Sequence, residues 1–142
     1  MVDAEPIHRG DKVYLDVPYV LVRWVGDGRW VHVEWKAWAN SSEYRAAHET
    51  ILLAIRENRA SRNLIDATHE RVVTDDDQRW LIENWIPRAA AAGRRCTAIV
   101  MPKSALGKTI SENIDKRPRH SLSKVAYFAT VDEAATWLST VN

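Results

Sequence analysis

Cysteine is almost absent from this chain of 142 residues: Cys96 is its only one, so no disulfide bond can form within it. A chain without disulfides fits a reducing compartment, and we expect a cytoplasmic protein. No apolar run approaches the roughly 20 residues that a membrane-spanning helix needs. The first residues also lack the apolar stretch of a signal peptide. The sequence therefore predicts no membrane span.

An excess of charge of either sign is also missing. The chain has 20 basic and 19 acidic side chains and a formal net charge of +1, so no overall field attracts it to nucleic acid. One local basic group, between Lys116 and Lys124, lacks the interleaved aromatic residues on which bases stack. A solvated loop explains this group, and we expect no nucleic-acid partner.

The motifs of common catalytic and metal sites are absent as well. The five histidines show no metal-ligand spacing, and no nucleophile-elbow motif occurs. The three carboxylates Asp75–Asp77 suit the first turn of a helix better than a metal site, because consecutive helical residues point in different directions. The sequence LGKT at 106–109 resembles part of a phosphate-binding loop, but Pro102 stands where that loop needs glycine. We expect no enzyme activity, no metal and no cofactor.

Tryptophan, in contrast, is abundant, with seven residues, and apolar residues make up 46% of the chain. A chain of this length favours a single domain over residues 1–142, with 1–11 loosely attached. Such a domain buries about 70% of the surface that the unfolded chain exposes, which is enough for a substantial core.

The N-terminal third has the pattern of β-strands. Residues 13–17, 19–25 and 29–38 are rich in β-branched and aromatic residues, Pro18 interrupts the first two, and a Gly-Asp-Gly turn precedes the third. The segments around this turn predict an antiparallel hairpin. In its second strand, Trp30 and Trp38 fall on the face opposite Val31 and Val33. An exposed patch of Trp30 and Trp38 would suit a homodimer.

After the hairpin, helical and strand patterns alternate, which is typical of an α/β fold with a partly parallel sheet. Asn40 and Glu43 form the pattern of a capping box, Thr74 is a good N-cap, and Pro87 predicts a kink near Glu83. The expected helices begin near residues 40, 74, 104 and 130, and the expected strands are 63–68, 96–101 and 124–130.

Four motifs carry a family resemblance: LID at 64–66, TDDDQRWLIENWIPRAAAAG at 74–93, TAIVMPKS at 97–104 and VDEAATWL at 131–138. With this order of elements, the chain resembles the SpoIIAA-like, or STAS/SEC14-like, family of small bacterial proteins over roughly residues 13–138. The resemblance implies a STAS-like fold: a mixed sheet of five or six strands with an N-terminal antiparallel hairpin and about four packed helices.

The same resemblance implies a non-enzymatic binding or regulatory module. The better-known relatives are anti-anti-sigma factors, which bind a regulatory kinase and are switched by phosphorylation at the helix that follows the central strand. Here the usual Asp-Ser-Ser/Thr-Gly run is replaced by the segment from Asp66 to Glu70. Thr68 and Thr74 are the candidate phosphorylation sites.

The sequence itself places a binding site in the same region. Asp66, Thr68 and His69 follow a buried strand, and ligands of open α/β sheets favour the crevice beyond the carboxyl ends of strands. In the simpler alternative, Asp66 accepts hydrogen bonds from nearby backbone and His69 faces water. A second hypothesis is a carrier of a small apolar or lipidic ligand, held in a groove beside Trp80 and Trp85.

Overall fold

A single mixed β-sheet, with its strands in chain order, organises the protein. The computed structural model describes residues 10–70, 73–107 and 123–141. Within them the sheet contains β1 (Lys12–Val17), β2 (Val20–Val25), β3 (Trp30–Trp35), β4 (Arg62–Asp66), β5 (Cys96–Val100) and β6 (Lys124–Phe128). Strands β1, β2 and β3 are antiparallel, and β3 to β6 are parallel. The predicted α/β class and N-terminal antiparallel hairpin are confirmed, with β1 as an additional antiparallel strand.

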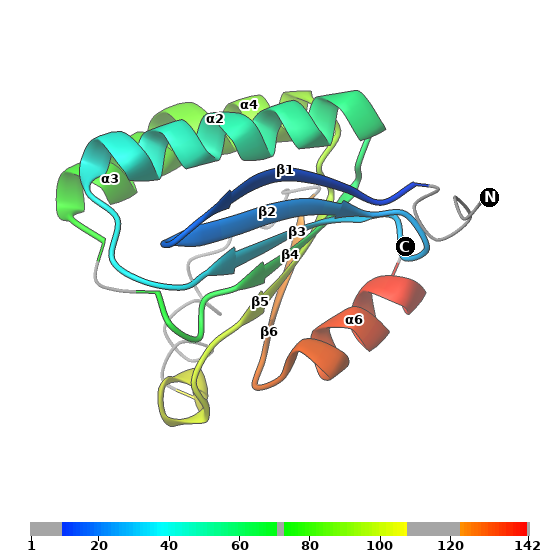
Figure 1. The fold of residues 1–142 in the computed structure, drawn as a ribbon. Coiled ribbons are helices and arrows are strands. Elements are labelled where there is room, and N and C mark those ends of the chain that lie inside the picture. Colours follow the sequence, from blue (N-terminus) through cyan, green and yellow to red (C-terminus); the bar gives the residue numbers. More distant parts are fainter. Residues whose placement is uncertain (1–9, 71–72, 108–122, 142) are drawn as a thin grey trace.

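Helices cover both faces of this sheet (Figure 1). One face carries α2 (Ser41–Asn58) and a continuous helical segment of α3 (Asp75–Trp80), η1 (Leu81–Trp85) and α4 (Ile86–Ala91). The other face carries α6 (Val131–Thr140). Residues 103–107 are also helical, and the remainder of the helix expected over 104–114 lies outside the described residues.

The start of α2 follows the predicted capping box. The backbone N–H of Glu43 donates to Asn40 Oδ1 at 2.8 Å, and the backbone N–H of Asn40 donates to Glu43 Oε1 at 3.0 Å. Two backbone donors that the first turn leaves free are thereby satisfied. The helix ends at Arg59, which adopts the left-handed conformation at φ 49°.

The long helical segment shows the expected effect of Pro87. Residues Leu81–Trp85 form a π-helical turn between α3 and α4. Pro87 has no N–H for the carbonyl of Glu83, and its ring would collide with that carbonyl in a regular α-helix. The wider π-turn removes this collision, so the structure has a π-turn at the place where the sequence predicted a kink.

Two apolar cores lie on the two faces of the sheet. The larger one joins Val20, Val22, Val31 and Val33 of the sheet to buried residues of α2 and to Trp85 and Ala89. The smaller one joins Leu64, Ala98 and Val100 to Ala134 and Leu138 of α6. Each fully buried Val, Leu or Ile contributes about 1.5–3 kcal/mol to folding, so both faces of the central strands are firmly covered.

The expected aromatic patch of Trp30 and Trp38 is wrong. Strand β3 ends at Trp35, so its alternation of faces does not continue to Trp38. Trp30 begins β3 and packs, half-buried, against the core under α6. Trp38 lies beyond the opposite end of β3 and is 63% exposed. Because the covered sheet face takes in Trp30, these two residues cannot form a shared dimer surface.

Candidate functional site

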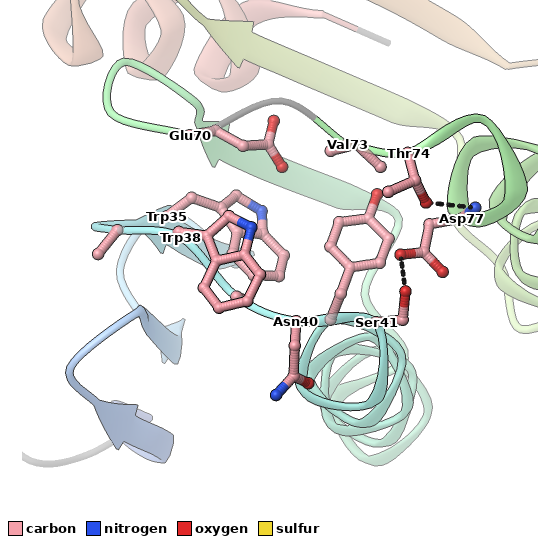
Figure 2. A pocket seen from close by; sticks show the side chains of 11 residues that line it. Trp35, Trp38, Asn40, Ser41, Glu70, Val73, Thr74 and Asp77 are labelled. Carbon is pink, nitrogen blue, oxygen red and sulfur yellow. Dashed lines mark hydrogen bonds between the residues drawn. The ribbon is translucent and has the colours of Figure 1, made fainter.

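A pocket of about 270 Å³ opens beyond the carboxyl ends of the parallel strands β3 and β4. Three segments enclose it: the connection from β3 to the start of α2, the loop after β4, and the start of α3 (Figure 2). The lining residues are Trp35, Ala37, Trp38, Ala39, Asn40, Ser41, Tyr44, Glu70, Val73, Thr74 and Asp77.

Aromatic rings form one wall of this pocket. Trp35 and Tyr44 are stacked, with ring centroids 5.3 Å apart and ring planes at 23°. Both are nearly buried, so they are held by the core, whereas Trp38 presents most of its ring to the solvent. The wall therefore combines a fixed base with one accessible ring (Figure 2).

His48 supports this wall from behind. Its ring lies 5.5 Å from that of Trp35 and 4.4 Å from that of Tyr44. Burial lowers the pKa of His48 to about 4, so the imidazole is neutral at pH 7. Its Nδ1 lies 2.9 Å from the carbonyl oxygen of Tyr44, and since a carbonyl accepts, Nδ1 carries the proton. Trp85 fixes the same helix by donating its indole N–H to the carbonyl of His48 at 2.7 Å.

Asp77 is a structural carboxylate at the far side of the pocket. It accepts from Ser41 Oγ at 2.7 Å and from Arg45 Nε at 2.9 Å, so it connects α3 to α2. These groups, Ser41 above all, hold the pKa of Asp77 below its usual range. Its backbone N–H donates to Thr74 Oγ1 at 3.2 Å, which confirms Thr74 as the N-cap. The negative charge of Asp77 is therefore balanced within the chain.

Glu70 is the opposite case. Its half-buried carboxylate has no hydrogen-bond or ion-pair partner among the residues that the structure describes. Burial alone raises the pKa of Glu70 to about 7. Glu70 lines the pocket with Trp35, Trp38 and Tyr44, and Figure 2 shows its side chain near the two tryptophan rings. At neutral pH the pocket therefore contains a carboxylate that is partly ionised and that no described side chain pairs with.

Glu70 also borders a second, more polar hollow of about 310 Å³, together with Lys36, Thr68 and His69. Thr68 and His69, both predicted from the sequence, thus lie beside the pocket instead of within it. Asp66 Oδ1 accepts from the backbone N–H of Thr68 at 3.0 Å, and His69 is exposed. Both observations match the simpler alternative considered for these residues.

The groove expected beside Trp80 and Trp85 is wrong in one essential respect. Trp85 is 2% exposed and belongs to the larger core, so it offers no surface to a ligand. Trp80 is half-buried against the same core, and the guanidinium of Arg45 lies 5.3 Å from its ring centre. The π-turn accommodates Pro87, and the helical segment still lies against α2. Trp85 of this segment donates a hydrogen bond to the carbonyl of His48 on α2.

Sequence reasoning missed four pocket residues: Trp35, Trp38, Tyr44 and Glu70. A prediction that β3 pairs in parallel with β4 would have brought these residues together. The carboxyl ends of parallel strands lie at the same edge of a sheet, so the segments that follow them are neighbours. The third strand was interpreted only as part of a hairpin, so the segment after it was not placed next to the loop after β4.

The described part of the chain shows neither a metal-binding cluster nor a membrane-spanning helix. None of its His, Cys, Asp and Glu side chains gather in groups of three or more that would suit a metal ion. Within the same ranges, no helix has the length and apolar character needed to cross a bilayer.

Comparison of the chain with protein-family models, with curated proteins and with solved structures yields no match. The site is therefore interpreted from its own geometry and chemistry.

Proposed function

We propose that this chain is a cytoplasmic, non-enzymatic binding or regulatory module of the STAS-like type. It recognises its partner through the pocket between the end of β3, the loop after β4 and the starts of α2 and α3. The observation that carries the proposal is the pocket itself, which lies where a partly parallel sheet favours ligands. It combines accessible aromatic surface with a carboxylate that has no partner among the described residues.

The stiffness of the surroundings supports a binding role. Stacked rings, the Asp77 bonds between α3 and α2, and the capped start of α2 fix the aromatic wall and the two helix starts that line the pocket. A preformed site loses little conformational freedom on binding. No pair of groups within it has the arrangement of nucleophile and base that a catalytic site requires: Ser41 donates to a carboxylate whose charge Arg45 already balances.

A phosphorylation switch at Thr68 or Thr74 belongs to the same proposal. Thr74 is exposed at the rim of the pocket, so a phosphate there would change docking directly. It would also break the N-cap and stand beside Asp75, Asp76 and Asp77, so modification would loosen the start of α3. Intact-mass analysis of protein from its native cells checks this: no phosphoform under any growth condition counts against the switch.

The carrier of a small apolar ligand is the second candidate, and the aromatic wall favours it. A volume of about 270 Å³ lies below the roughly 300–1,000 Å³ of pockets for drug-sized ligands, which restricts such a ligand to a short group.

Photo-crosslinking in the native cells tests the proposal and separates its two forms. A photoreactive residue replaces Ala37 at the exposed rim of the pocket, and Val13, exposed on β1, is the matched control position. The module predicts a protein adduct at position 37 that is absent at position 13. A small-molecule adduct at position 37 would favour the carrier, and equal adducts at both positions, or none, would contradict both.

A further inference from the structure

We infer that the pocket binds an alkylammonium group, with Glu70 as its counter-ion and the rings of Trp38, Trp35 and Tyr44 as its walls. The group is either a free small amine or the side chain of a lysine. This inference rests on the proposed function and adds the chemistry of the ligand.

The first argument is the balance of charge around the pocket. Among the described residues, its lining contains two carboxylates and no basic side chain. Arg45 neutralises Asp77, and no described side chain compensates the charge of Glu70. The nearest lysine in the lining of the second hollow, Lys36, forms an ion pair with Asp16 at 3.2 Å. A half-buried carboxylate without a partner is costly, and a cationic hydrogen-bond donor removes that cost.

The second argument comes from the aromatic rings. Elsewhere in the described chain, cations lie over aromatic faces: Lys12 over Tyr14, Arg29 over Trp24, Arg45 over Trp80 and Arg94 over Trp85. No such internal cation is found over the three pocket rings within these residues. Aromatic faces attract cations, most strongly when water is partly excluded. Of the three rings only Trp38 is widely exposed, so its ring is the accessible cation-binding face in the pocket that Glu70 also lines.

Other ligand classes fit less well. An anion would be repelled by Glu70 and would meet the electronegative faces of the rings. A neutral apolar group would fill the space but leave Glu70 without a partner. The volume suits one short alkyl chain with a single charged end, and the hydroxyl of Tyr44, which makes no hydrogen bond in the described part of the chain, is available to that end.

The test is an NMR titration of the full ¹⁵N-labelled chain at pH 8, followed at the tryptophan indole N–H signals. The probes are n-butylammonium, n-butanol and butyrate, which share one alkyl chain, and a blocked Gly-Lys-Gly peptide. We expect n-butylammonium to shift the Trp38 signal saturably, with a dissociation constant of roughly 1–10 mM for so small a probe. n-Butanol should bind at least roughly tenfold more weakly, and butyrate should not bind.

The lysine peptide distinguishes the two sources of the group. Binding of the peptide at least as tight as that of n-butylammonium assigns the pocket to a lysine side chain of a partner protein. Binding of the amine alone assigns it to a free small amine. Either result supports the inference.

Two variants test the role of the Glu70 carboxylate: one removes its charge, and the other removes a charge outside the pocket. Glu70→Gln keeps the shape but removes the charge, and it should weaken n-butylammonium binding at least roughly tenfold. Glu83→Gln removes an equally negative but exposed side chain on η1, outside the pocket lining, and should leave the affinity unchanged.

The failures of the two proposals are distinguishable. If n-butanol binds as tightly as n-butylammonium, or if Glu70→Gln binds the amine unchanged, the alkylammonium inference is overturned while the binding pocket stands. If no probe shifts the Trp38 signal, the alkylammonium inference is overturned, and the crosslinking experiment decides the proposed function separately.

Discussion

The substitution Glu70→Gln should raise the free energy of unfolding of the unliganded protein at neutral and alkaline pH, and should leave it unchanged below about pH 4.5. Burial raises the pKa of Glu70 from its ordinary value of 4.5 to about 7, without a compensating partner. The folded protein therefore holds this proton more tightly than the unfolded chain does. Between pH 4.5 and 7 the folded state binds more protons, so the contribution of Glu70 to the free energy of unfolding falls as the pH rises.

The size of this effect follows from the two pKa values. Each pKa unit corresponds to about 1.4 kcal/mol, so the upper limit is about 3 kcal/mol. Because Glu70 is only half-buried, solvent screening reduces the expected effect to about 1–2 kcal/mol. Below pH 4.5 both side chains are neutral and nearly isosteric, so the variant and the native protein should be equally stable. At pH 8 Glu70→Gln should be more stable by the full amount.

Urea denaturation at a series of pH values measures the effect. The difference between the two proteins isolates Glu70, because the contributions of His32 and His48 are common to both. A Glu70→Gln variant that is equally stable, or less stable, at pH 8 would refute the reasoning, since it would mean that the carboxylate has a favourable partner. Glu83→Gln, at an exposed position, controls for the loss of one negative charge.

Three other expectations follow from the same structure. The affinity for n-butylammonium should rise with pH through about 7, because Glu70 becomes ionised there. The other titratable groups that line the two hollows are Tyr44, Asp77, Lys36 and His69. Calorimetry at several pH values measures this affinity, and an affinity that does not change with pH would argue against the role of Glu70. Thr74→Ala should lower the free energy of unfolding by about 1 kcal/mol in urea denaturation, because the N-cap bond to Asp77 is lost; an unchanged value would contradict this. In an NMR pH titration the imidazole signals of His32 and His48 should move near pH 4 instead of near 6.5, because burial disfavours their charged forms; ordinary midpoints would show that these rings reach water.

Local physics made much of the fold predictable. The capping box of Asn40 and Glu43, the N-cap Thr74 and the disturbance by Pro87 depend on neighbours within a few residues, and the structure shows each of them. The α/β alternation follows from hydrophobic periodicity, which is equally local.

The pocket was less predictable, because it depends on contacts between distant segments. Trp38 was assigned to a sheet face by extending an alternation that actually stops at Trp35. Glu70 was passed over because its sequence neighbourhood does not reveal that it is half-buried and that none of the described side chains pairs with it. Only the pairing of β3 with β4 brings these two residues to one site. The pocket does lie beyond the end of the strand at Asp66, the region that the behaviour of parallel sheets indicated, and its role in binding stays a prediction.

Intermolecular nuclear Overhauser effects test the central claim most directly. With n-butylammonium bound to the full chain at pH 8, the account predicts contacts from the alkyl protons of the probe to the ring protons of Trp38 and Tyr44, and their loss in Glu70→Gln. Contacts to other surfaces only, or contacts at Trp38 that persist unchanged in Glu70→Gln, would contradict it.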